Sequence, residues 1–284
     1  MPKNYHFSRT NNLKKIQNVI AAVVIILLII SGIIILPKIP EISLTNLNAI
    51  PVTPPPCELS DQLQPPANTA NLTFNIPDKS QSQIFRRVKP KNNEKVIALT
   101  IDDGPWKKTT LEILDIFKQN HVQATFFWVG TSLKNNPEIA KQVVAQGHAI
   151  GNHTWSHSTQ PMNPITAKNE IECTAQLIYT TTGVKTALFR PGGGRLNNGL
   201  SAYAKTQNYA IFKWSVNSGD SNSSDSQFIV NNVIKGAKTG AIVLLHDGRG
   251  DRTKTVKALP EIINRLKQQG YRFVTLPELL EMQQ

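Results

Sequence analysis

Cysteine is scarce in this chain of 284 residues, since only Cys57 and Cys173 are present. Two cysteines form one disulfide at most, so a disulfide-stapled scaffold and a cysteine-rich zinc site are excluded; the sequence leaves open whether the two pair. Only one apolar run approaches the length of a membrane span, which excludes a many-pass membrane protein. Because 40% of the residues are hydrophobic and only 18% are charged, the chain can bury a core, which excludes wholesale disorder and a coiled coil.

Acidic residues are also few, and their shortage gives a net charge of +12 (31 basic minus 19 acidic). Such an excess suggests an anionic partner. Four of these positive charges lie in residues 1–18, one net charge (six minus five) lies in 19–94, and +7 (21 minus 14) remains on 95–284. We find no basic stripe and no recognition motif, so we expect no nucleic acid partner.

The one long apolar run, residues 19–36, reads VIAAVVIILLIISGIIIL and carries no charge. A helix of that length covers about 27 Å, close to the hydrocarbon thickness of a bilayer. Four basic residues precede it without an acidic one: Lys3, Arg9, Lys14 and Lys15. The positive-inside rule therefore predicts a cytoplasmic tail (1–18), a transmembrane signal anchor (19–36) and an extracytoplasmic remainder. A cleaved signal peptide is the alternative, although its apolar core is usually shorter.

Residues 37–94 hold ten prolines, and Cys57 lies among them. Such a segment buries too little apolar surface to fold, so we expect an extended linker. From residue 95 to residue 284, short apolar runs alternate with amphipathic ones, which predicts an α/β domain with a mainly parallel sheet. The expected strands are 96–101, 123–129, 149–151, 186–190, 209–214, 241–246 and 271–274. The expected helices are 110–119, 137–146, 165–181, 200–207, 226–238 and 253–269.

Since 190 residues (284 minus 94) are few for an eightfold barrel, we expect an incomplete (β/α) barrel of about seven strands, with an open doubly wound sheet as the alternative. Ionisable residues recur at the ends of the expected strands: Asp102, Asp103, His153, Arg190, Asp220 and His246. The carboxyl ends of parallel strands share one face, and that face carries the active site in such folds. These six side chains are therefore expected to converge.

His153 and His157 are four residues apart, which places both imidazoles on one side of a helical turn. That spacing suits a metal ion, and Asp103 is placed to supply a third ligand. Two histidines and a carboxylate hold catalytic zinc, but they also form the facial triad of non-haem iron, so the ligand set leaves the metal open.

These segments resemble the polysaccharide deacetylases with a NodB homology domain, carbohydrate esterase family 4, over residues 95–282. TIDDGP (100–105) resembles the first motif and HTWSH (153–157) the second. FRPGGG (189–194), WSVNSGD (214–220) and LLH (244–246) resemble the third, fourth and fifth. The resemblance implies a distorted (β/α) barrel and a divalent metal, with zinc expected before cobalt, nickel or another ion.

The resemblance also implies roles for single residues. Asp102 is the expected general base, and Asp103, His153 and His157 are the expected metal ligands. His246 is the expected general acid, Arg190 orients the base and Asp220 tunes the acid. The backbone N–H groups at Gly192 and Gly193 are expected to hold the oxyanion formed when water attacks an acetamide.

This sequence departs from the family pattern at three positions. Gly193 stands where an aromatic residue is common, Asn217 where Asp is frequent, and Ser221 where Trp usually follows the Asp. We expect these changes to alter the range of substrates more than the activity. We interpret His148 as a packed histidine and Asp247 as structural. For Trp128, Trp155 and Trp214 we prefer a position in the core, and stacking on sugar rings is the alternative. For Arg195, Arg249 and Arg252, solvated loop charge is the expectation, and contact with an anionic glycan is the alternative.

Together these features predict a membrane-anchored, metal-dependent hydrolase that removes N-acetyl groups from an extracytoplasmic polysaccharide. Peptidoglycan N-acetylglucosamine is the first expected substrate, and chitin-like oligomers are the second. An O-acetyl esterase of the xylan type and an inactive glycan-binding module remain as alternatives. The sequence does not indicate an oligomeric state.

Overall fold

The computed structural model describes residues 73–283, apart from residues 75, 223 and 224. The expected tail (1–18), the expected membrane span (19–36) and most of the expected linker (37–94), Cys57 included, lie outside the described residues. Within the described part, no helix has both the length and the apolar character that crossing a bilayer requires. Cys173 is buried on helix α5 (Pro164–Thr182).

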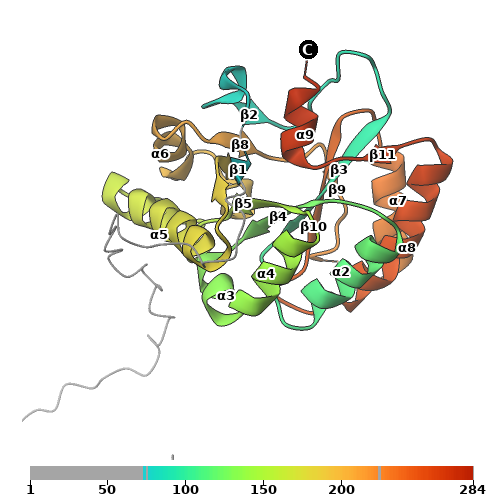
Figure 1. Ribbon diagram of the computed structural model, residues 1–284, viewed down its shortest axis with the longest axis horizontal. Helices are drawn as coiled ribbons and strands as arrows, with labels where there is room; N and C mark the ends of the chain where they lie inside the picture. Colours follow the sequence, from blue (N-terminus) through green and yellow to red (C-terminus); the bar gives the residue numbers. More distant parts are fainter. Residues whose placement is uncertain (1–72, 75, 223–224, 284) are drawn as a thin grey trace, which may run out of the picture. The chain divides into compact units, whose positions relative to one another are not determined.

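A curled, parallel sheet forms the centre of the domain (Figure 1). Its strands run in the order β2 (Ile84–Phe85), β8 (Ala210–Phe212), β7 (Leu188–Phe189), β5 (Ala149–Asn152), β4 (Thr125–Trp128), β3 (Val96–Asp102), β10 (Ala241–His246) and β9 (Val216–Asn217). Strand β11 (Arg272–Phe273) pairs with β3, and β1 (Thr73–Phe74) pairs with β6 (Lys185–Thr186) in a separate small sheet. The expected incomplete barrel is thus confirmed as a curled parallel sheet. The sheet has more strands than the number of about seven that was expected.

Helices cover the outside of this sheet (Figure 1). They are α2 (Thr109–Gln119), α3 (Gly130–Asn135), α4 (Pro137–Ala145), α5, α6 (Leu200–Thr206), α7 (Ser226–Gly236), α8 (Thr253–Gln268) and α9 (Leu276–Glu281). All six expected helices are present, and each observed end lies within two residues of the expected one. Side chains cap three of them by accepting backbone N–H groups of the first turn: Asn163 on α5, Asp225 on α7 and Thr275 on α9.

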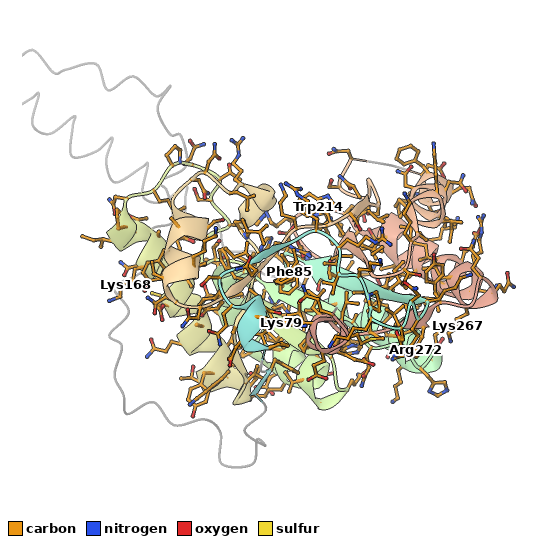
Figure 2. All side chains as sticks on the ribbon, turned by 90° about the horizontal axis from the view of Figure 1, so that it is seen from above. Lys79, Phe85, Lys168, Trp214, Lys267 and Arg272 are labelled. Carbon is orange, nitrogen blue, oxygen red and sulfur yellow. The ribbon has the colours of Figure 1, made fainter. Side chains whose placement is uncertain are left out.

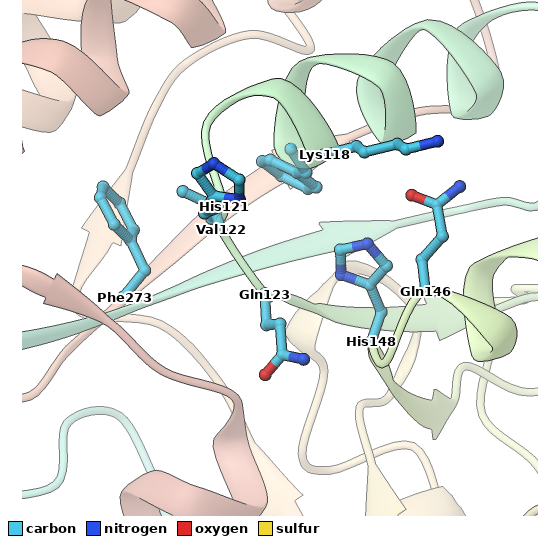
Figure 3. Close-up of a pocket in the computed structure, with 8 residues that line it drawn as sticks. Lys118, His121, Val122, Gln123, Gln146, His148 and Phe273 are labelled. Carbon is cyan, nitrogen blue, oxygen red and sulfur yellow. The ribbon is translucent and has the colours of Figure 1, made fainter.

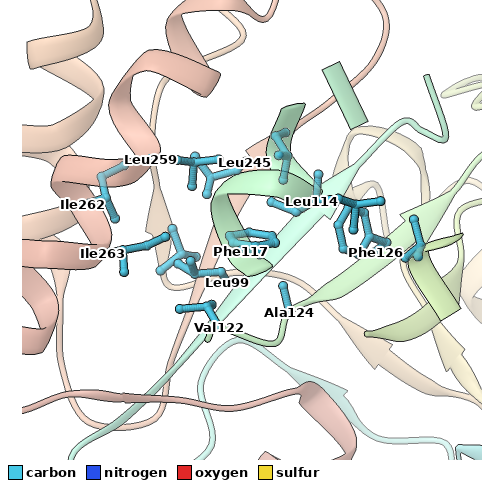
Figure 4. Close-up of a cluster of buried hydrophobic side chains, with 14 of the residues drawn as sticks. Leu99, Leu114, Phe117, Val122, Ala124, Phe126, Leu245, Leu259, Ile262 and Ile263 are labelled. Atoms are coloured by element: carbon cyan, nitrogen blue, oxygen red, sulfur yellow. The ribbon is translucent and has the colours of Figure 1, made fainter. Parts of the chain in front are cut away.

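The main hydrophobic core lies between the sheet and the outer helices. Leu259, Ile262 and Ile263 of α8 pack with Phe117 of α2 against Leu99 of β3 (Figure 4). Successive strand residues point to opposite faces, so Ile97, Leu99 and Ile101 belong to this core, whereas Val96 and Ala98 belong to a second core inside the curl of the sheet.

The same alternation fixes the direction of the residues that end the strands. Asp102 continues the inward series of Val96 and Ala98, and His246 continues the inward series of Ile242 on β10. The register pairs Asp102 with His246 directly. Both side chains therefore face the inside of the curl at its carboxyl end.

Candidate active site

A cavity of about 290 Å³ opens at the carboxyl ends of the strands. It is lined by Asp102, Asp103, His153, His157, Gly193, Gly194, Trp214, Ser221, Leu244, His246, Arg249 and Arg252. Asp102 ends β3, His153 follows β5, Arg190 follows β7 and His246 ends β10. Asp220 follows β9, a two-residue strand that the sequence pattern did not show. The structure therefore brings together the six strand-end residues, as expected.

Asp103, His153 and His157 form a group suited to a metal ion, with one ligand atom from each residue within 4.8 Å of the others. Asp103 Oδ1 lies 3.8 Å from His153 Nε2 and 3.4 Å from His157 Nε2. This buried oxygen has no hydrogen-bond partner in the described structure, which is costly unless a cation or water satisfies it. The donor set and its unsatisfied oxygen therefore fit a divalent cation.

The protonation of these side chains also suits a cation. His153 Nδ1–H donates to the carbonyl of Arg190 at 2.7 Å, which leaves the Nε2 lone pair directed toward Asp103. Burial lowers the pKa of His153 and of His157 to about 3, so both rings are neutral at pH 7. Burial raises the pKa of Asp103 to about 6, against the opposing charge of His246. Neutral imidazoles and a carboxylate are the forms that bind metals.

The two histidines do not share a helical turn, so that expectation from their spacing is wrong. They lie in a loop after β5, in which Thr154 and His157 have positive φ angles of 69° and 57°. Asn152 Oδ1 accepts from Thr154 N and Thr154 Oγ1 accepts from His157 N, both at 2.9 Å. Such side-chain turns compete with helix formation. The loop nevertheless places the two imidazole rings 4.8 Å apart, centre to centre.

Glu170 of α5 holds this loop from behind. Its two carboxylate oxygens accept from Ser156 N at 2.9 Å and from Ser156 Oγ at 2.6 Å. The side chain is only 2% exposed, so these hydrogen bonds are shielded from water. Sequence analysis missed Glu170 because it lies thirteen positions after His157, in a helix, and matches no site motif.

Asp102 and Arg190 form a buried ion pair. Arg190 Nη1 donates to Asp102 Oδ1 at 2.6 Å and to Thr100 Oγ1 at 2.8 Å. The rest of the guanidinium group donates to the carbonyls of Phe212 and Lys213, and lies over the ring of Phe127. Asp102 Oδ2 is left 3.5 Å from His153 Nε2. Arg190 therefore fixes one carboxylate oxygen and leaves the other facing the metal-ligand group.

His246 and Asp220 form a second pair. Asp220 accepts from His246 Nδ1 through Oδ1 and from His246 N through Oδ2, both at 2.8 Å. Ser218 Oγ and Thr255 Oγ1 donate to the same carboxylate. Burial opposes charging of His246, but the hydrogen bond and charge of Asp220 outweigh it and raise the pKa of His246. Its Nδ1 is occupied, so Nε2 is the ring nitrogen that remains for chemistry in the cavity.

The glycine segment 192–194 supplies another part of the cavity wall. Gly193 and Gly194 line the cavity, and Gly193 has a φ of 59°, which favours glycine. Gly192 does not line the cavity but supports the histidine loop, because a Cβ there would lie 3.0 Å from the carbonyl oxygen of His157. Of the other departures from the family pattern, Ser221 lines the cavity, whereas Asn217 lies in a neighbouring groove.

Several residues without an expected catalytic role also have defined surroundings. His148 is buried between Phe117 and Phe126, and its Nδ1 accepts from Ala124 N. It lines a separate pocket near the amino ends of β4 and β5, which agrees with a packed histidine (Figure 3). Trp128 and Trp155 are buried. Trp214, labelled in Figure 2, is partly buried: it packs against the second core, as expected, and also lines the active-site cavity.

Four further charged residues differ in their surroundings. Asp247 is fully buried, and its Oδ2 accepts from Thr110 Oγ1 at 2.6 Å, which agrees with a structural role. Arg195 is exposed, as expected for solvated charge. Arg249 and Arg252 line the cavity. Arg252 is only 6% exposed, so solvated loop charge was the wrong expectation for it, whereas Arg249 is exposed, as expected.

Comparisons with known proteins show which proteins the chain is similar to. The family model described as Polysaccharide deacetylase matches residues 89–212. A peptidoglycan-N-acetylglucosamine deacetylase of Bacillus cereus is 44% identical over 192 residues, which cover 66% of this chain and 90% of that protein. A bifunctional xylanase/deacetylase of Pseudobutyrivibrio xylanivorans is 41% identical over 192 residues, 67% of this chain and 31% of that protein.

A solved structure has a fold similar to that of this chain. The crystal structure of the Bc1960 peptidoglycan N-acetylglucosamine deacetylase superposes with a TM-score of 0.67 at 34% identity. The superposition covers 72% of this chain and 95% of that one.

Proposed function

The chain belongs to the polysaccharide deacetylase family, carbohydrate esterase family 4, and on that basis we propose that it removes N-acetyl groups from the N-acetylglucosamine of peptidoglycan. The family makes it a hydrolase of carbon–nitrogen bonds in acetylated sugars. Peptidoglycan is preferred as the polymer because the Bacillus cereus relative carries that name. Chitin-like oligomers are the second choice.

One observation carries the proposal. A single cavity holds a group suited to a cation, Asp103 with His153 and His157, beside two separately paired proton-transfer groups, Asp102 and His246. Hydrolysis of an acetamide needs these functions together, because its carbonyl is a weak electrophile and its amine a poor leaving group. A divalent cation at this group supplies positive charge that polarises a carbonyl and acidifies water. We propose zinc first, with cobalt or nickel as alternatives.

Asp102 is suited to act as the general base. Its Oδ1 is held by Arg190, and its Oδ2 lies near His153 Nε2, so Oδ2 is the oxygen that accepts a proton from attacking water. Arg190 is fully buried and makes four polar contacts, so it acts by fixing the orientation of the carboxylate. Gly193 lines the cavity, and we assign stabilisation of the oxyanion to its backbone N–H, since the N–H of Gly194 donates to the carbonyl of Pro191.

His246 is suited to act as the general acid. Asp220 binds Nδ1 and favours the protonated ring, so Nε2–H can donate to the departing sugar amine. This proton favours an N-acetyl substrate, because an amine leaves only after protonation whereas an alkoxide leaves more readily. An inactive glycan-binding module is disfavoured because all five reactive side chains are present: Asp102, Asp103, His153, His157 and His246.

Acetate release from peptidoglycan, N-acetylglucosamine oligomers and O-acetylated xylan, measured side by side, tests the proposed substrate. We expect the highest kcat/KM on peptidoglycan and the lowest on xylan. A higher kcat/KM on O-acetylated xylan would favour the esterase alternative.

A further inference from the structure

The active-site cavity has more positive charge than its reaction requires. Asp102 is paired with Arg190 and Asp220 with His246, while Asp103 faces two neutral histidines in the group suited to a cation. The remaining charges on the cavity wall are the guanidinium groups of Arg249 and Arg252. In the described part of the chain, neither forms an ion pair with a carboxylate. Positive charge without a partner in a cleft attracts anions.

The loop that carries Arg249 is held in place. Arg252 Nε donates to the carbonyl of Gly248 at 2.7 Å, and its Nη2 donates to the carbonyl of Arg249 at 3.2 Å. Its Nη1 donates to the carbonyl of Asp220, which ties the loop to the partner of the general acid. Asp251 then accepts from Thr253 N and Thr253 Oγ1 at the start of α8. The guanidinium nitrogens of Arg252 therefore donate to backbone carbonyls, and these hydrogen bonds hold the loop segment that carries Arg249.

Arg249 itself remains available to a ligand. Its side chain is exposed, it has no hydrogen bond or ion pair within the described residues, and its backbone φ is 56°. The nearby carboxyl of Asp247 is bound to Thr110 and does not line the cavity. A guanidinium group without a partner can bind a carboxylate with two parallel hydrogen bonds.

We propose that Arg249 binds a carboxylate of the glycan and makes the enzyme prefer acidic over neutral acetylated polymers. This inference rests on the proposed function, since it concerns the substrate of the same cavity. Peptidoglycan offers two sources of such a group: the lactyl carboxylate of muramic acid, which is free where the peptide has been removed, and the carboxylates of the peptide. Neutral chitin oligomers and xylan offer none.

Acetate release and equilibrium binding are measured with the full chain and three substrates: glycan strands stripped of peptide, the same strands with their carboxylates converted to neutral amides, and peptide-bearing strands. Arg249→Gln removes the charge, Arg249→Lys retains it, and Lys257→Gln is the control, since Lys257 is an exposed cation on α8. We expect Arg249→Gln to lower kcat/KM and the binding affinity on acidic strands about tenfold. On amidated strands, the same substitution should change both quantities less than about twofold. Arg249→Lys should restore part of the loss on acidic strands.

The acidic strand on which Arg249→Gln loses more identifies the source of the carboxylate. Equal losses on acidic and amidated strands would overturn the proposal, because Arg249 would then act on the reaction and not on substrate charge. Unchanged binding to acidic strands in Arg249→Gln would overturn it as well. If the unmodified protein released no acetate from any strand, the proposed function would fail, while the binding comparison would still decide the role of Arg249.

Discussion

Asp102 and Asp103 are adjacent in the chain, but their surroundings give them different chemistry. Asp102 ends β3 and points into the curl of the sheet, where Arg190 binds it. Asp103 has a φ of 84°, so its side chain leaves the strand alternation and faces the two histidines with a carboxylate oxygen that no hydrogen bond satisfies. The change of backbone direction between the two residues separates the proposed base from the proposed metal ligand.

Substitution of the two groups should therefore have separable effects. We expect Asp102→Asn to keep the bound metal but lower kcat about 10²–10⁴-fold, because it removes a general base and retains the ligand set. His153→Ala should lose the metal as well as the activity, since it removes a ligand that is only 1% exposed. Metal content by elemental analysis and kcat from acetate release distinguish the two. His121→Ala, an exposed histidine outside the cavity, serves as the control.

Near wild-type acetate release by Asp102→Asn would show that another group removes the proton. Full metal content in His153→Ala would contradict the proposed ligand set.

The pairing of His246 with Asp220 predicts the alkaline limb of the pH–rate profile. Asp220 raises the pKa of His246, and the protonated ring is the form that acts as the acid, so the rate should fall as pH rises through this raised pKa. Asp220→Asn removes the charge and lowers that pKa, and we expect the alkaline limb to move to lower pH with a smaller kcat. A profile of kcat against pH for both proteins measures the shift. An unmoved alkaline limb would exclude His246 as the acid.

At the scale of single elements, the histidine loop depends on a side chain from a distant helix. Thr154 and His157 hold positive φ angles that cost energy in non-glycine residues, and Glu170 fixes the intervening Ser156 by two hydrogen bonds. Glu170→Gln replaces one acceptor oxygen by a donor. We expect metal affinity to fall about 10–100-fold, as for other residues that orient ligands, with kcat recovering at saturating metal.

Chelator competition gives the metal affinity of Glu170→Gln, and thermal unfolding of the metal-free protein gives its stability. The control is Glu172→Gln, because Glu172 lies on the same helix but bonds Tyr203 instead of the loop. A lower melting temperature with unchanged metal affinity would indicate a purely structural role for Glu170.

The sequence predicted elements where a side-chain pattern extends over several residues. Helix α8 repeats buried residues at Leu259, Ile262, Ile263 and Leu266, and its predicted ends differ from the observed ones by one residue at most. Strand β9 has two residues, too few to show an alternation, and it was missed. Strand β2 was missed because residues 37–94 were expected to be an extended linker, whereas β2 pairs with β8 and Phe85 and Val88 are buried in the second core. The histidine loop was misread as a helical turn because spacing alone does not reveal the side-chain turns of Asn152 and Thr154.

The packing of α8 on the sheet predicts a large loss of stability on truncation. Ile262 is fully buried beneath the helix, so Ile262→Ala should lower the free energy of unfolding by about 2–5 kcal/mol. Ile165 on α5 is 74% exposed, and Ile165→Ala should change it by less than about 0.5 kcal/mol. Denaturant unfolding of the metal-free proteins measures both. Equal effects would contradict the packing shown in Figure 4.

At the scale of the whole molecule, the site was predictable because the fold is parallel. Residues from Asp102 to His246 span 145 positions, and the shared carboxyl edge of the strands brings them into one cavity. The supporting role of Glu170 was not predictable, because its burial and its pairing with Ser156 depend on contacts between elements. Charge is spread over the domain, with Lys168 and Lys267 at opposite edges in Figure 2, so the total charge indicated no single surface.

We propose that the full chain is anchored in the membrane by residues 19–36, with the catalytic domain on the extracytoplasmic side. The apolar run and the four basic residues before it support this topology. Leu27→Arg combined with Leu28→Arg should release the protein from the membrane fraction, because each charge at a span centre costs about 2.5–3.5 kcal/mol. Alkaline extraction and protease accessibility in intact cells measure anchoring and sidedness. Extraction of the unmodified chain with soluble proteins would contradict the anchor.

The most direct test of metal-dependent deacetylation is acetate release from peptidoglycan by one preparation of the full chain, before chelation, after removal of metal, and after addition of zinc. We predict release before chelation, its loss with the metal, and its recovery on addition of zinc, with equal amounts of acetate and new free amine. Acetate release that continues at the same rate after complete removal of the metal would contradict this account.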